Sequence, residues 1–194
     1  MIQKSMLVKI SGCIVLATML ATAMPAVAQI ESIDARARGT STQMGRDFDI
    51  KVSIDKFSTP QDRAALVAAF QKGGNDEMVK VLSKMKSVGR IRIPARTGYP
   101  IAYSRSIPTP TGRKIRFVTD RPIAFAESRN MTRTQQYSLT CGEIDINDQN
   151  KDKSTGVLYP AAKLRVNKDG ELEFELYQNP WQLVNIIDWT RSKE

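Results

Sequence analysis

Four carboxylates in the middle of the chain are the side chains best suited to acid–base chemistry. A glycoside hydrolase needs two carboxyl groups close together, one as acid and one as nucleophile or base. The candidates here are Asp120, Glu127, Glu143 and Asp145. Glu127 ends an apolar run, and the other three would be neighbours in a sheet, but the sequence does not set their separation. A carboxylate-based hydrolase is therefore the least favoured function for this chain.

Histidine is absent from the sequence, and its absence excludes several kinds of site. Ser-His-Asp and Cys-His nucleophilic sites need an imidazole base, and the usual zinc ligand sets include histidine. Cys141 is the one cysteine beyond the N-terminal leader described below, so no intramolecular disulfide is expected. Its neighbours Leu139 and Ile144 predict a buried, unreactive thiol. We expect no cofactor, because a glycine-rich phosphate loop is also missing.

Oxygen-bearing side chains cluster within residues 145–152 and suggest a calcium loop. They are Asp145, Asn147, Asp148, Asn150 and Asp152. An EF-hand loop also needs glycine at its sixth position and glutamate at its twelfth. Counted from Asp148, those positions hold Lys153 and Tyr159, and a count from Asp145 fails as well. We therefore expect a solvated hairpin loop and no metal site.

Basic residues are concentrated in the middle third of the chain. Within residues 80–133, thirteen Lys or Arg stand against two acids, and the whole chain carries a net charge of +9. In residues 90–93 and 114–117 the cations alternate with apolar residues, which is typical of a strand with one buried face. We expect a cationic outer surface on the sheet. The candidate binding residues are Arg90, Arg92, Lys114, Arg116 and Arg121.

Two interpretations of this basic face remain open. One is binding to an anionic envelope component or an anionic protein partner. The other is a solvated surface, partly neutralised by the acidic strand that contains Glu171, Glu173 and Glu175. Nucleic acid is not the expected partner, because the chain begins with an export signal.

The first 28 residues predict a cleavable secretory signal peptide. Lys4 and Lys9 supply a positive start, residues 10–23 are uncharged and apolar or small, and residues 26–28 read Ala-Val-Ala. This order of parts is what signal peptidase requires. The run is too short to span a bilayer stably, which takes roughly 20 residues. Cys13 superficially matches a lipoprotein box, but most of the apolar run follows it, so lipidation is not expected.

Residues 29–194 predict a single β-rich domain that is periplasmic or secreted. The clearest strand, near residues 47–55, alternates apolar and polar side chains. A helical hairpin is expected at about residues 60–87, with Ser58 or Thr59 as cap and a break at Gly73-Gly74. The fold class is mostly β, an antiparallel barrel or sandwich of about eight strands. Other strands are expected at 30–39, 90–93, 99–107, 113–119, 121–127, 137–146, 156–166, 171–176 and 183–189.

Three segments resemble a group of small secreted bacterial proteins of unknown function. They are residues 115–123 (IRFVTDRPI), 142–146 (GEIDI) and 156–163 (GVLYPAAK). The resemblance covers roughly the C-terminal half, and residues 59–89 are loosely similar. Its motifs are structural in character, and the group has no assigned activity, so no catalytic residue carries over.

The favoured function is therefore an exported, non-enzymatic binding or envelope-associated protein. The alternative is a small-ligand carrier with a lipocalin-like cavity. The cavity would be lined by Phe117, Phe125, Leu172, Phe174 and Trp189.

Overall fold

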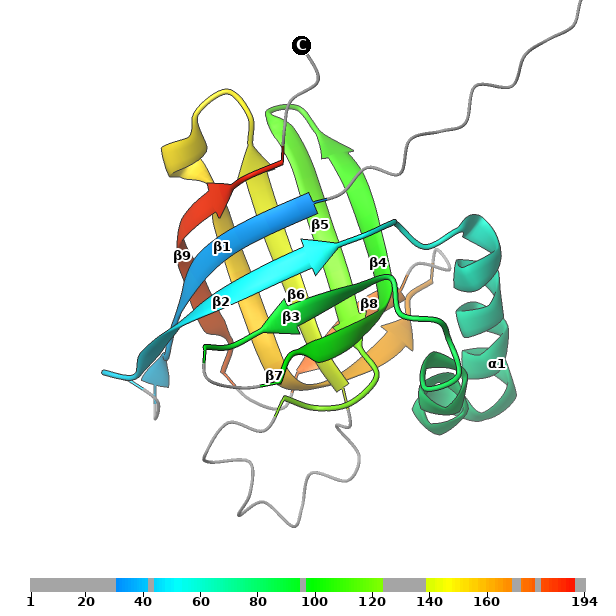
Figure 1. The fold of residues 1–194 in the computed structure, drawn as a ribbon. Helices are drawn as coiled ribbons and strands as arrows, with labels where there is room; N and C mark the ends of the chain where they lie inside the picture. Colours follow the sequence, from blue (N-terminus) through cyan, green and yellow to red (C-terminus); the bar gives the residue numbers. More distant parts are fainter. Residues whose placement is uncertain are drawn as a thin grey trace, which may run out of the picture.

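Eight antiparallel strands close into a barrel in the part of the chain that the structure describes (Figure 1). The structure is a computed structural model, and it describes residues 31–41, 44–94, 97–123, 139–168, 172–176 and 179–190. The barrel strands are β1 (Glu31–Arg38), β2 (Asp47–Ile54), β3 (Gly89–Arg92), β4 (Tyr99–Thr109), β5 (Gly112–Thr119), β6 (Leu139–Asn147), β7 (Thr155–Val166) and β9 (Trp181–Asp188). The predicted signal peptide lies outside the described residues.

Strand β7 allows the sheet to close because it serves different partners along its length. One edge pairs with β6, while on the other edge residues 156–158 pair with β9 and residues 162–166 pair with β8 (Leu172–Leu176). Strand β9 then pairs with β1 and completes the ring. The expected choice between barrel and sandwich is thus decided in favour of a barrel.

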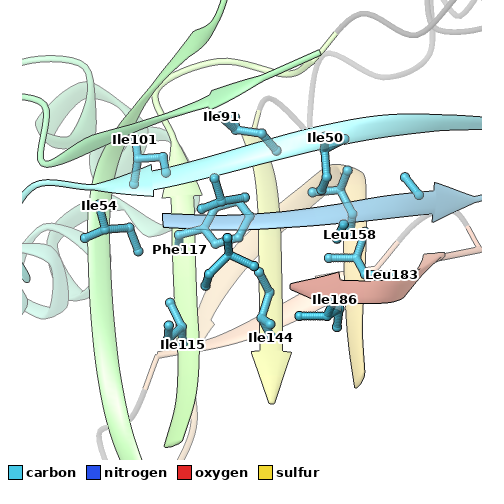
Figure 2. Packing of buried hydrophobic residues seen from close by; sticks show 14 of the residues in the cluster. Ile50, Ile54, Ile91, Ile101, Ile115, Phe117, Ile144, Leu158, Leu183 and Ile186 are labelled. Carbon is cyan, nitrogen blue, oxygen red and sulfur yellow. The ribbon is translucent and has the colours of Figure 1, made fainter. Parts of the chain in front are cut away.

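The inward-facing side chains pack into one apolar cluster inside the barrel (Figure 2). Where the side chains are described, alternate residues of the strands point inward, and Ile33, Val52, Ile91, Ile115 and Phe117 are all 0% exposed. An eight-stranded barrel has an interior just wide enough for side chains to fill. Burying each large aliphatic side chain contributes about 1.5–3 kcal/mol, so this cluster is the main source of stability.

Phe117 fits inside the barrel because the residue opposite it has no side chain. Gly142 of β6 is the register partner of Phe117 of β5. A Cβ atom added at Gly142 would overlap the Phe117 ring. The only large aromatic residue among the fully buried side chains of the described core therefore depends on one glycine.

A helical insertion, α1 (Pro60–Leu82), covers one side of the barrel from outside (Figure 1). Thr59 is its N-cap and forms a capping box with Asp62, and Pro60 occupies the first turn. The helix is broken at Gly73 and Gly74, as the sequence predicts. Gly74 has φ 65° and ψ −149°, a conformation that residues with a Cβ rarely adopt.

The insertion packs a second apolar cluster against the outer surface of the barrel. Leu66, Met78 and Leu82 are each 0% exposed. They belong to the same cluster as Val118 and Cys141, which face outward from β5 and β6. No described helix is long and apolar enough to cross a membrane.

The strand expected at residues 121–127 is not present in its described part. Strand β5 ends at Thr119, and the chain bends through residues 120–123. The Thr119 hydroxyl donates to the Arg121 carbonyl, and the Thr140 hydroxyl accepts from the Ile123 amide at 2.7 Å. These side chains hold the backbone in a bend. Residues 124–127 lie outside the described residues.

We predict that Gly142→Ala destabilises the barrel by about 1–3 kcal/mol, the usual cost of overpacking a core. Urea unfolding of residues 29–194 would measure the loss. Because the clash is with the Phe117 ring, Gly142→Ala combined with Phe117→Leu should cost less than the sum of the two single changes. Strict additivity of the two changes would contradict this packing argument.

Candidate functional site

The predicted basic face is divided into two parts by the strand order. Arg90 and Arg92 lie on the outer face of β3, whereas Lys114 and Arg116 lie on the outer face of β5. Arg90 is opposite Pro100 of β4, while Arg116 and Lys114 are opposite Arg105 and Ile107 of the same strand. Arg105 and Ile107 lie five and seven residues beyond Pro100, which is about 17 and 23 Å along the strand. The cations therefore do not form one continuous surface.

The cations of β5 are neutralised by β6. Lys114 Nζ lies 2.8 Å from Glu143 Oε1, and Arg116 Nε lies 2.6 Å from Glu143 Oε2. Burial alone would raise the pKa of Glu143, but the hydrogen bonds from Lys114 and Arg116 outweigh it and lower that pKa. Asp145 lies 3.8 Å from Lys114. The acidic partners described for these cations thus come from β6.

The described part of the acidic strand is β8. It pairs with β7, with Glu173 opposite Arg165 and Glu175 opposite Lys163. Arg121 is also paired, because its Nε and Nη2 atoms each lie 2.9 Å from the Asp120 carboxylate. Three of the five predicted binding cations therefore have an acidic partner.

Arg90 and Arg92 differ from the other three. Both are exposed, and neither forms an ion pair with a residue that the structure describes. Their nearest neighbours across β2 are Ser53 and Lys51, which offer no negative charge. Gly98 lies against both side chains, and a Cβ there would come within 2.8 Å of each stem. The two guanidinium groups therefore leave positive potential on this side of the barrel.

A groove of about 620 Å³ lies beside Arg92 on the outer face of four adjacent strands. Its main side chains come from β1, β2, β3 and β9: Asp34, Arg36, Asp49, Lys51, Arg92 and Ile187. The acids are matched by neighbouring cations, since Lys51 lies 3.7 Å from Asp34 and Arg36 lies 3.8 Å from Asp49. Arg36 also binds Asp47 at 2.8 Å. Arg92 is the groove cation without a described acidic partner.

The side of the groove formed by β9 is apolar and exposed. Ile187 is 48% exposed, and the following Trp189 is 58% exposed. The Trp189 Nε1 donates to Asp34 Oδ2 at 2.8 Å, which fixes the indole beside the groove. Asn185, with φ 52°, lies at the register shift between β1 and β9 just before these residues. Sequence analysis assigned Trp189 to an interior cavity, but its side chain lies outside.

A cluster of charged side chains around Arg113 lies at one end of the barrel. The sequence analysis did not predict it. Arg113 donates from Nη2 to Glu31 at 2.9 Å and to Asp188 at 2.7 Å, and from Nη1 to Asp148 at 2.8 Å. Glu31 is 0% exposed and also accepts from the Thr190 hydroxyl. Burial alone would lower the pKa of Arg113, but its hydrogen bonds to Glu31 and Asp188 raise that pKa. The sequence carried one signal for this cluster, because Arg113 lies two residues before the inward-facing Ile115 and therefore on the same face of β5.

The four candidate catalytic carboxylates do not converge on a shared pocket where they are described. Glu143 and Asp145 face outward from β6 beside Lys114, and Asp120 is bound by Arg121. Glu127 lies outside the described residues. Cys141 is 0% exposed, as predicted, and burial raises the pKa of its thiol.

The oxygen-rich loop after β6 uses its side chains to shape the backbone. Asn147 Oδ1 accepts from the amides of Gln149 and Asn150, and Asn150 Oδ1 accepts from the Asp152 amide. Asp148 binds Arg113. Among the described residues, no three His, Cys, Asp or Glu side chains are grouped so that they could hold a metal ion.

The four described residues among those expected to line a carrier cavity lie in different parts of the structure. Phe117 is part of the packed interior, and Trp189 is on the outer surface. Leu172 and Phe174 belong to β8, which pairs with β7 beside the eight-strand ring. Phe125 lies outside the described residues.

Comparison with known proteins identified no family for this chain. No family model matches it, and neither the curated proteins nor the solved structures contain a significant match. The resemblance to small secreted bacterial proteins therefore stays an expectation from the sequence, and the candidate site is interpreted from its own geometry.

We predict that Arg113→Met destabilises the protein by about 3–5 kcal/mol, because it leaves the buried Glu31 and the half-buried Asp188 without their cation. Arg121→Met is the matched control, since its partner Asp120 is bound at an exposed site, and it should cost no more than about 1 kcal/mol. Urea unfolding measures both. Adding Glu31→Gln to Arg113→Met should recover part of the loss. Equal effects of the two arginine changes would contradict a structural role for the cluster.

A second prediction follows from the lowered pKa of Glu143. Below its ordinary value of 4.5 the unfolded chain binds the proton more readily, so the stabilisation is present above that pH and is lost as pH falls through the folded-state pKa. The difference in unfolding free energy between the unmodified chain and Glu143→Gln should therefore shrink below pH 4.5. Urea unfolding at a series of pH values tests this, and a constant difference would contradict the ion-pair assignment.

Proposed function

We propose that this chain is an exported, non-enzymatic binding protein of the periplasm or extracellular space, which binds an anionic envelope component through the outer face of β3. The observation that carries the proposal is the contrast between two sets of predicted cations. Lys114, Arg116 and Arg121 are bound by carboxylates, whereas Arg90 and Arg92 have no acidic partner among the described residues.

The geometry of the two β3 arginines suits an anion. They are two residues apart on one strand, which sets their Cα atoms about 7 Å apart on the same face. A guanidinium group binds phosphate or carboxylate with two parallel hydrogen bonds, and it keeps its charge at every physiological pH. Arg92 also borders the groove, so an anion bound there could make further contacts.

The fold supports binding at the surface. The described inward side chains pack as one cluster inside the barrel, so this rigid scaffold presents its outer strands at fixed spacing. A carrier of the lipocalin kind would need an interior cavity instead. Binding that depends on exposed charges should weaken as salt rises, whereas binding in an apolar cavity should not.

We predict that Arg90→Gln with Arg92→Gln weakens binding to anionic vesicles. The test is co-sedimentation of residues 29–194 with vesicles containing one-third phosphatidylglycerol, with pure phosphatidylcholine as the neutral control. Each basic residue near an anionic membrane surface contributes about 1 kcal/mol, so the double variant should bind about 30-fold more weakly.

Lys114→Gln with Arg116→Gln is the matched control, because it removes the same charge from cations that are already paired. It should change the affinity by less than about threefold. The proposal is contradicted if both double variants lose binding equally, or if anionic and neutral vesicles bind alike at about 50 mM salt, where screening is weak.

A further inference from the structure

The groove beside Arg92 has two chemically different sides. On the β3 side, Arg92 lines the groove, and Arg90 lies two residues before it on the same face of the strand. On the β9 side, Ile187 and Trp189 are two of the three large hydrophobic residues exposed in the described structure. A ligand that spans the groove would therefore meet a positive charge at one end and apolar surface at the other.

The strand register places these two sides opposite each other. Ile187 of β9 pairs with Asp34 of β1, and Asp34 pairs with Lys51 of β2. Lys51 in turn pairs with Arg92 of β3, so the four residues form one row across four strands. With neighbouring strands 4.7–4.9 Å apart, the ends of the row are about 14 Å apart. The groove volume of about 620 Å³ is in the range of small-molecule sites.

The middle of the row adds little net charge, because its acid is already matched. Asp34 accepts a hydrogen bond from Trp189 at 2.8 Å and lies 3.7 Å from Lys51. The charge that a ligand would meet is therefore that of Arg92, and the complementary ligand group is an anion.

Trp189 is positioned for an apolar partner before any ligand arrives. Its indole N–H is satisfied by Asp34, and its backbone N–H donates to the Ser32 carbonyl at 2.8 Å. The residue is nevertheless 58% exposed. A fixed aromatic ring with its polar group satisfied can contact an alkyl chain without losing a hydrogen bond.

We propose that this groove binds one molecule of an anionic amphiphile. Its phosphate or carboxylate head is held by Arg92, and its alkyl chain crosses the face of β2 and β1 to Ile187 and Trp189. The inference rests on the proposed function and names the class of ligand for the same face.

The experiment is a titration of residues 29–194 with monomeric dodecyl phosphate, followed by tryptophan fluorescence. Trp181 is 3% exposed in the core, so a blue shift would report burial of Trp189. Inorganic phosphate supplies the head alone, and monomeric dodecyl maltoside supplies the chain with an uncharged head. Dodecyl phosphate should bind tightest, and Trp189→Phe should abolish the blue shift.

Two substitutions with matched controls separate the two sides. Arg92→Gln and Ile187→Ser should each weaken dodecyl phosphate binding about five- to tenfold. Arg121→Gln removes a cation away from the groove, and Met44→Ser removes an 80% exposed apolar side chain that does not line it. Both controls should leave the affinity unchanged.

The outcomes distinguish this inference from the proposed function. If dodecyl phosphate binds no tighter than inorganic phosphate, while vesicle binding still depends on Arg90 and Arg92, the amphiphile site is overturned and the proposed function stands. The amphiphile site is also overturned if Ile187→Ser weakens binding to vesicles but not binding to monomeric dodecyl phosphate. The face would then dock on a bilayer. If neither vesicles nor dodecyl phosphate depend on the β3 arginines, both proposals fail.

Discussion

Closure of the barrel brings Arg113 against Glu31 and Asp188, and these ion pairs link three strands at one end of the barrel. Glu31 begins β1, Asp188 ends β9, and these are the two strands whose pairing closes the ring. Arg113 reaches both carboxylates from β5 at 2.7–2.9 Å. A buried carboxylate is costly without a partner, so this end of the barrel is stable only when all three strands are in place.

Closure and packing determine which surfaces remain for binding. The interior holds one apolar cluster, and α1 covers the outside of the barrel near β4 to β7 with a second cluster (Figure 1). The outer face of β9, β1, β2 and β3 lies away from the helix. This is the face that contains the groove and the arginines of β3. The insertion thus divides the outer surface of the barrel into a buried side and an available side.

Strand order explains why the cations of two similar basic strands differ in whether they are paired with carboxylates. Strands β3 and β5 both alternate cations with apolar residues. Beside β5 lies β6, whose outward Glu143 binds two cations. Beside β3 lies β2, whose outward residues at the paired positions are Lys51 and Ser53. A cation on an exposed strand becomes available to a ligand only when its cross-strand neighbour is not an acid.

The sequence by itself determined the features that depend on neighbours in the chain. Alternation of apolar and polar residues predicted the strands and their inward faces, and Thr59, Pro60 and Gly73-Gly74 predicted the start and the break of α1. Only the tertiary structure decided between a barrel and a sandwich. It also paired Arg113 with carboxylates 75 and 82 residues away in the chain. It separated the two β3 arginines from Lys114 and Arg116 of β5. The physical reason is that periodicity is local, whereas closure and ion pairing depend on which distant strands become neighbours.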